Sequence, residues 1–143
     1  MVAEILLHIG MHKTGTTALQ TALAGYDDGR TRYARLGHPN HSIPFVTSFA
    51  SEPHRYHVWK RIGASPEQVA QKRANLRAKL DSELALPHRR LLVVGEEISL
   101  LPTAAVRAIT THLTEGNRHL TILAYLRDPD GNKICGLYRM PKV

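Results

Sequence analysis

Eight consecutive residues near the N-terminus carry the groups that a phosphate-binding loop needs. Residues 10–17 read Gly-Met-His-Lys-Thr-Gly-Thr-Thr. Backbone N–H groups of a glycine-rich turn can point together at an anion, and a helix that follows adds roughly half a positive charge at its N-terminus. A lysine ammonium and threonine hydroxyls supply further hydrogen-bond donors. The pattern predicts that a phosphate-bearing ligand is bound by Gly10, His12, Lys13, Thr14, Gly15, Thr16 and Thr17.

The segments on both sides of this loop are the ones that would position it. Residues 4–9 form a short apolar run, which predicts a buried β-strand that ends at Gly10. Residues 18–24 predict a helix with Gly25 as its C-cap. A strand, a loop and a helix in this order are the context in which phosphate loops occur. A turn rich in glycine and threonine, without a ligand, is the alternative.

The loop departs from the G-x-x-x-x-G-K-[ST] pattern of nucleoside triphosphatases. Gly10 and Gly15 flank four residues as in that pattern, but the next residue is Thr16, and the lysine lies inside the loop as Lys13. A P-loop kinase or NTPase would also need an acidic residue at the end of a strand to hold Mg²⁺, and Glu96 matches that role poorly. That class is therefore an alternative that the loop itself disfavours.

Residues 8–20, HIGMHKTGTTALQ, resemble the loop that holds the 5′-phosphosulfate of 3′-phosphoadenosine 5′-phosphosulfate (PAPS) in PAPS-dependent sulfotransferases. They look closest to a bacterial branch of that family. The resemblance implies that residues 1–143 are a single sulfotransferase-like domain, the N-terminal part of the family's usual length. It implies a P-loop NTPase-like sulfotransferase core, incomplete at the C-terminus, with PAPS as the sulfuryl donor. An inactive fragment or a nucleotide-binding module is the alternative.

A second anion site is implied near the C-terminus. The family holds the 3′-phosphate with an arginine at the end of a later strand and a serine eight residues on. Residues 125–129, Tyr-Leu-Arg-Asp-Pro, are similar to that motif and put Arg127 in the arginine's place. Cys135 stands where the serine would be, and a thiol is a weak donor. The alternatives are an ion pair of Arg127 with Asp128 or another nearby acidic residue, and a buried apolar role for Cys135.

A candidate general base follows a second strand. Residues 90–95, of which 91–94 are apolar, predict a strand, and Glu96 and Glu97 come directly after it. Ligands of open α/β sheets bind at the carboxyl edge of the strands. The resemblance implies that Glu97 takes the acceptor's proton, while Lys13 neutralises the charge on the leaving bisphosphate; Glu96 is not separated firmly from Glu97. A favourable interaction of both acids with a helix terminus is the alternative.

The remaining pattern favours an α/β fold. Residues 120–126 predict a third apolar strand, and helices are predicted over 66–85, which begins with a capping box at Ser65, and over 102–113. Alternating helices and apolar strands predict a three-layer, mostly parallel sheet with flanking helices. Residues 26–57 predict loops with at most one short helix. Residues 128–133 are turn-rich where the alternation calls for another helix.

The histidines and aromatic residues allow several roles. The loop region contributes His38, His41, His54 and His57, which could line an acceptor pocket, although surface positions are the simpler interpretation. Their spacing does not match a zinc site, so no metal is expected. His8 is expected to pack within the first strand. Trp59 and Tyr56 are expected to serve packing rather than sugar binding.

Composition sets the broad class. The chain has 143 residues, a formal net charge of +7 and one cysteine. A basic balance favours anionic partners without choosing among them. The longest apolar runs are far below the roughly 20 residues of a membrane span, and the N-terminus does not read as a secretory signal. A cytoplasmic enzyme is expected, with a small-molecule or glycan acceptor, no specific nucleic acid, and a possible homo-oligomeric state.

Overall fold

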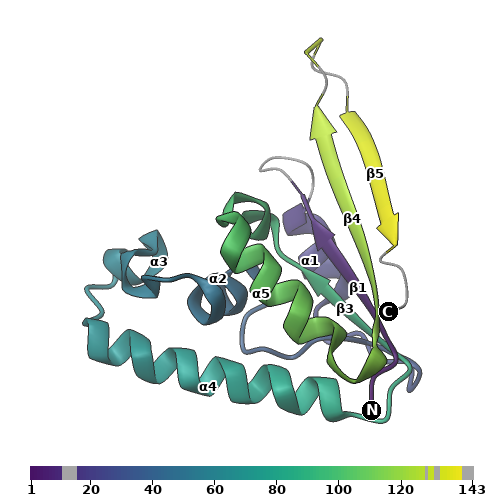
Figure 1. The fold of residues 1–143 in the computed structure, drawn as a ribbon, viewed down its shortest axis with the longest axis horizontal. Coiled ribbons are helices and arrows are strands. Elements are labelled where there is room, and N and C mark those ends of the chain that lie inside the picture. The colour runs from purple at the N-terminus through teal and green to yellow at the C-terminus, as the bar shows by residue number, and fades with distance from the viewer. Residues whose placement is uncertain (11–15, 128, 131–132, 140–143) are drawn as a thin grey trace.

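The protein is built around one mixed β-sheet of five strands (Figure 1). The computed structural model describes residues 1–10, 16–127, 129–130 and 133–139. The spatial order is β2-β3-β1-β4-β5; the first four of these strands are parallel to one another, and β5 is antiparallel to β4. The predicted α/β class is therefore confirmed. The strands are β1 (Glu4–Ile9), β2 (Thr31–Tyr33), β3 (Arg90–Val94), β4 (His119–Arg127) and β5 (Lys133–Arg139).

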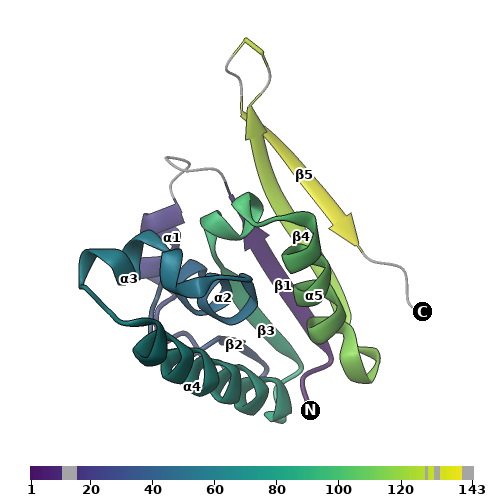
Figure 2. The same ribbon diagram turned by 60° about the vertical axis from the view of Figure 1, so that its left-hand side comes forward.

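The two faces of this sheet are covered by different numbers of helices. The α-helices are α1 (Thr16–Leu23), α2 (Ser42–Phe49), α3 (His57–Arg61), α4 (Pro66–Ala85) and α5 (Thr103–Thr114), and short 3₁₀ helices are η1 (Pro53–Arg55), η2 (Glu96–Leu100) and η3 (Glu115–Asn117). α2, α4 and α5 lie on one face, while α1 lies on the other (Figures 1 and 2). Among the helices that the structure describes, none is both long and apolar enough to cross a membrane.

The hydrophobic core lies between the sheet and the three helices on its better-covered face. Side chains alternate across a strand, so Ile5 and Leu7 of β1 face this core, whereas Leu6 between them remains half-buried. The core residues of the other elements include Phe45 and Phe49 of α2, Leu80 and Leu84 of α4, Leu91 and Val93 of β3, Ile109 and Leu113 of α5, and Leu120 of β4. Their burial keeps the three helices in place against the sheet.

The helices with local sequence signals form where the sequence predicts them. α4 spans Pro66–Ala85, and its capping box is complete: the Ser65 Oγ accepts from the Gln68 N–H, and the Gln68 side chain accepts from the Ser65 N–H. α5 begins and ends within one residue of its prediction. Helix caps and hydrophobic periodicity involve residues that are close together in the sequence, and for this reason the sequence alone predicts these helices.

The prediction for residues 26–57 is wrong. This region contains β2, α2, η1 and the start of α3, where loops with at most one short helix were expected. The sequence does not predict α2, because almost all of its residues are buried and it therefore lacks the polar stripe of a surface helix. In addition, Pro44 is typical of a turn. This helix is stabilised by the packing of Phe45 and Phe49 into the core and not by a local sequence signal.

The C-terminal tail also differs from its prediction. Residues 133–139 form strand β5, which pairs antiparallel with β4, with Arg127 opposite Lys133 and Thr121 opposite Arg139. The described residues between these strands, Pro129 and Asp130, form a turn, since two antiparallel strands need only a short connection. β5 is the edge of the sheet, and its described side chains, from Cys135 to Arg139, are exposed.

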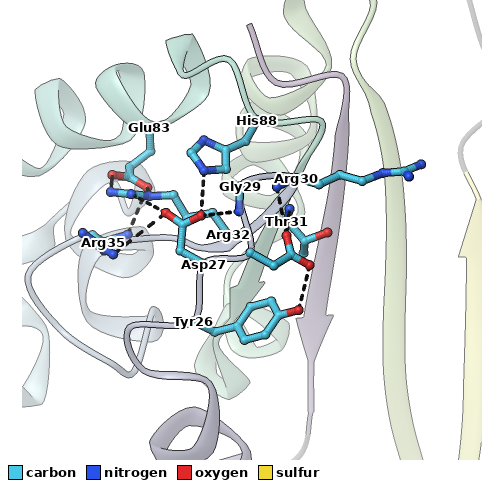
Figure 3. Close-up of polar contacts among 10 residues, drawn as sticks. Tyr26, Asp27, Gly29, Arg30, Thr31, Arg32, Arg35, Glu83 and His88 are labelled. Atoms are coloured by element: carbon cyan, nitrogen blue, oxygen red, sulfur yellow. Dashed lines mark hydrogen bonds and ion pairs between the residues drawn. The ribbon is translucent and has the colours of Figure 1, made fainter.

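A charge network fixes the loop before β2 at the amino edge of the sheet (Figure 3). Asp27 accepts hydrogen bonds from the Gly29 N–H at 3.0 Å, from His88 Nε2 at 2.8 Å and from Arg32 at 2.9 Å. The Gly29 N–H and then His88 hold the pKa of Asp27 well below its usual range. Arg32 also binds Glu83 of α4 through two hydrogen bonds of 2.9 Å. The network thus joins β2, α4 and the start of β3.

Candidate functional site

The three segments that carry the predicted site leave the sheet at one edge. β3, β1 and β4 are neighbouring parallel strands, with His8 opposite Val94 and Ile9 opposite Ala124. The Gly95 N–H donates to the His8 carbonyl at 3.0 Å, so the chain after β3 runs beside the end of β1. Gly10, Glu96 and Glu97, and the backbone of Arg127 therefore lie at the carboxyl edge, where α/β sheets bind ligands.

The central part of the predicted phosphate loop lies outside the described residues, namely His12, Lys13, Thr14 and Gly15. Gly10 is buried at the end of β1, and α1 begins at Thr16, so a strand and a helix border the loop as predicted. The structure describes the backbones of Thr16 and Arg127 but not their side chains. Thr17 is exposed in the first turn of α1. The ligand-binding roles of these residues stay predictions.

The chain after β3 touches the N-terminus of α2 at Gly95. A Cβ atom added to Gly95 would lie 2.7 Å from the Ser42 nitrogen, closer than real Cβ contacts, and 3.0 Å from the His41 carbonyl carbon. A backbone hydrogen bond joins the same two segments: the His41 N–H donates to the Val94 carbonyl at 3.0 Å. The glycine therefore permits α2 to pack directly against the end of β3.

His41 stabilises this junction from inside the core. It is fully buried, its Nδ1 accepts the Val94 N–H at 3.0 Å, and its Nε2 lies 2.8 Å from the Ala34 carbonyl. A nitrogen that accepts a backbone N–H carries no proton, so the proton is on Nε2, which donates to Ala34. Burial lowers the pKa of His41 to about 4. The expected surface position is wrong for His41, which is a neutral structural residue.

Glu97 is held by groups from α2 and α3. Its backbone N–H donates to the Ser42 Oγ at 3.0 Å. One carboxylate oxygen accepts the Tyr56 hydroxyl, and the other lies 2.7 Å from the Nε2 of His57. The Glu97 side chain is only 14% exposed. Both carboxylate oxygens are therefore hydrogen-bonded within the protein, and the side chain is fixed in orientation.

α3 places Tyr56 and His57 opposite Glu97 because Trp59 anchors it. The Trp59 ring is 4% exposed, and its Nε1 donates to the Thr47 Oγ of α2 at 2.9 Å. The predicted packing role of Trp59 is thereby confirmed. Tyr56 is half-buried at the start of α3, and burial, followed by its bond to Glu97, raises its pKa. Tyr56 therefore stays protonated and donates to the carboxylate.

The two other candidate positions have separate surroundings. Glu96 begins η2 beside Glu97 and is half-buried. Cys135 is exposed on β5, opposite Tyr125 in the ladder, so its alternative role as a buried apolar residue is wrong. The hairpin brings its backbone two positions from the Arg127–Lys133 pair. His8 is buried in β1, as predicted.

An open hollow in the described part of the protein lies away from this site. An open depression of about 1290 Å³ covers the amino-terminal half of the sheet face that carries α1. Its floor includes Leu6 and Leu92, and on its rim Arg89 and Arg90 form ion pairs with Glu4 at 3.0 and 2.7 Å. None of its lining residues belongs to the predicted site. The described residues also hold no group of three His, Cys, Asp or Glu side chains placed for a metal ion.

The chain matches no model of a known protein family, no curated protein and no solved structure. The sulfotransferase resemblance therefore stays a prediction that rests on the quoted motifs. The contacts of Ser42, Tyr56 and His57 with Glu97 had no counterpart in the sequence motifs. The one signal that pointed toward them was the group of histidines between residues 38 and 57, which the sequence allowed to line an acceptor pocket.

Proposed function

We propose that this protein is a sulfotransferase that moves a sulfuryl group from PAPS to a hydroxyl or amine of a small-molecule or glycan acceptor. One observation supports the proposal: β1, β3 and β4 are adjacent parallel strands, so the strand ends that precede the predicted phosphate loop, the Glu97 cluster (Glu97, Tyr56 and His57) and the predicted 3′-phosphate motif lie at the same carboxyl edge of the sheet. A donor with two separate anionic groups needs binding groups from two of these segments, and the acceptor needs a base from the third.

Each segment has a distinct role in this reaction. Lys13, the loop N–H groups and the threonine hydroxyls bind the 5′-phosphosulfate and stabilise the charge that develops on the bridging oxygen. Arg127 binds the 3′-phosphate through its guanidinium fork, which suits phosphate oxygens. Cys135 takes the place of a hydroxyl donor. A basic group in the Glu97 cluster accepts the proton of the acceptor.

The reaction is an in-line displacement at sulfur. The acceptor oxygen or nitrogen forms a bond to sulfur while the bond from sulfur to the 5′-phosphate oxygen breaks. The electron pair of the broken bond stays on that oxygen, so 3′,5′-adenosine bisphosphate leaves as an anion. Stabilisation of this developing charge by preorganised donors is the largest contribution that such a site can make.

Calorimetric titration of the protein with 3′,5′-adenosine bisphosphate tests the proposal, with ADP and Mg²⁺ titrated in parallel. We expect magnesium-independent binding of the bisphosphate in preference to ADP. Loss of one charge-assisted contact in Lys13→Ala or Arg127→Ala weakens binding by roughly 10- to 100-fold, corresponding to about 1.5–3 kcal/mol.

Arg107→Ala is the matched control, because it removes one positive charge from the exposed surface of α5. Circular dichroism shows whether each variant is folded. An equal loss of affinity for the bisphosphate in Arg107→Ala and Arg127→Ala would mean that binding depends on net charge alone, which contradicts a specific site. Preference for ADP with Mg²⁺ would support a P-loop kinase or NTPase instead. A folded protein that binds neither nucleotide would refute the proposal.

A further inference from the structure

The Glu97 cluster presents an imidazole, rather than a carboxylate, to the solvent. The Glu97 side chain is 14% exposed and both of its oxygens are hydrogen-bonded, whereas the His57 side chain is 57% exposed. We propose that His57 takes the proton of the acceptor, and that Glu97 and Tyr56 are positioning residues that orient the His57 ring. This inference rests on the proposed sulfotransferase function and changes the assignment of its base from Glu97 to His57.

The hydrogen bond between His57 and Glu97 fixes which nitrogen is basic. A carboxylate can only accept hydrogen bonds, so the His57 Nε2, at 2.7 Å from the Glu97 oxygen, must carry the proton. The Nδ1 of the neutral ring then has a free lone pair with which it can accept a proton. Glu97 also stabilises the imidazolium that forms, as the carboxylate does in triads where it orients a histidine base.

Glu97 can orient the ring because it is itself held from two other directions. The Tyr56 hydroxyl occupies its second oxygen, and the Ser42 Oγ accepts its backbone N–H at 3.0 Å. Burial keeps Tyr56 protonated and therefore a donor. The Trp59 bond to Thr47 joins α3 to α2, and Gly95 lets α2 pack against β3. The geometry of the base is thus fixed by contacts on rigid elements, as precise proton transfer requires.

The acceptor oxygen bonds to sulfur as its proton passes to the His57 Nδ1, and the bond from sulfur to the bridging oxygen breaks. The electron pair of that bond remains with the departing 3′,5′-adenosine bisphosphate. The His57 imidazolium, paired with Glu97, then releases its proton to water and returns to the neutral form. The step needs no oxidant and no second cofactor.

The decisive experiment measures release of 3′,5′-adenosine bisphosphate from PAPS with 2-naphthol, 1-hexanol and glucose as acceptor probes. We expect His57→Ala to lower turnover by roughly 100-fold or more, the usual contribution of a general base, with unchanged affinity for the bisphosphate. Millimolar imidazole is expected to restore part of the activity, because it can occupy the space of the missing ring. The matched control, His54→Ala, lies three residues away on η1 and is expected to keep full activity.

A second measurement tests the pair without any acceptor. Diethyl pyrocarbonate modifies neutral imidazole, and mass spectrometry reports the rate at His57. We expect slower modification of His57 in Glu97→Gln, because the carboxylate that makes the ring more nucleophilic is lost, and an unchanged rate at His54. Tyr56→Phe removes only one donor to Glu97, so we expect a smaller loss of turnover that imidazole does not restore.

The outcomes separate this inference from the function on which it rests. A wild-type protein that binds no bisphosphate, or binds it and turns over no PAPS, overturns the sulfotransferase proposal. An active wild type with an equally active His57→Ala overturns only the role of His57, as does lost activity that imidazole fails to restore. Equal modification rates at His57 in the wild type and Glu97→Gln refute the positioning role of Glu97. Rescue by imidazole together with slower modification in Glu97→Gln supports the inference.

Discussion

We predict that the buried His41 makes the free energy of unfolding of this protein fall in mild acid. The ring is fully buried, and it uses its unprotonated Nδ1 to accept the Val94 N–H at the junction of α2 and β3. Protonation of Nδ1 would remove that acceptor and place a charge inside the core. Burial accordingly lowers the pKa of His41 from 6.5 to about 4, while the same ring in the unfolded chain keeps the ordinary value.

The sign and size of the effect follow from this difference. Above pH 6.5 neither state binds the proton, and His41 does not make stability depend on pH. Between pH 6.5 and about 4 the unfolded chain binds a proton that the folded chain does not, so the free energy of unfolding falls as the pH falls. A pKa lowered from 6.5 to about 4 amounts to roughly 3 kcal/mol, since each pKa unit is about 1.4 kcal/mol.

Urea unfolding of the wild type and of His41→Gln, at several pH values between 7 and 4, measures how much His41 contributes to the pH dependence of the free energy of unfolding. The glutamine has a donor and an acceptor but does not titrate. We expect the variant to be less stable at pH 7 and the difference in unfolding free energy to narrow toward pH 4. The other titratable groups are common to both proteins, so the comparison isolates the effect of removing His41. His54→Gln is the matched control, because it makes the same substitution at a histidine outside the core.

Nuclear magnetic resonance gives a second test that needs no variant to fold. The His41 ring resonances of the wild type should remain those of a neutral ring until the pH approaches 4. A ring that titrates near pH 6.5 would refute the reasoning, because it would mean that the ring is solvated in the folded protein. A difference in unfolding free energy that stays constant from pH 7 to pH 4 would refute it as well.

Three further substitutions test the packing of the fold by urea unfolding. Gly95→Ala is expected to cost about 1–3 kcal/mol, because its Cβ would meet the Ser42 backbone, and a loss below that range would show that α2 can move away freely. Glu83→Gln is expected to cost roughly 3 kcal/mol, because it leaves the mostly buried Arg32 with a weaker partner; an unchanged midpoint would contradict this account. Ser65→Ala removes the α4 N-cap and is expected to cost about 1 kcal/mol, whereas Ser65→Asn, which retains a capping oxygen, should be nearly neutral.

Local signals in the sequence determined the elements that border the site. The apolar run of residues 4–9, ended by Gly10, predicted β1, and the capping box at Ser65 predicted α4 to the residue. The sequence also located Glu97 directly after a strand. These signals work because strand burial and helix capping depend on residues within a few positions of one another.

The tertiary structure decided which groups meet at Glu97 and how the sheet ends. Tyr56 and His57 contact Glu97 but precede it by 41 and 40 residues in the sequence. No local sequence pattern predicts a contact between residues so far apart. α2, which carries Ser42 to the same place, is formed by burial in a core that neighbouring elements supply. The antiparallel pairing of β5 likewise depends on the exposed edge of β4 rather than on a periodicity of its own. The sequence by itself therefore determined the candidate groups on the central strands, and only packing between distant segments decided that a histidine stands between Glu97 and the solvent.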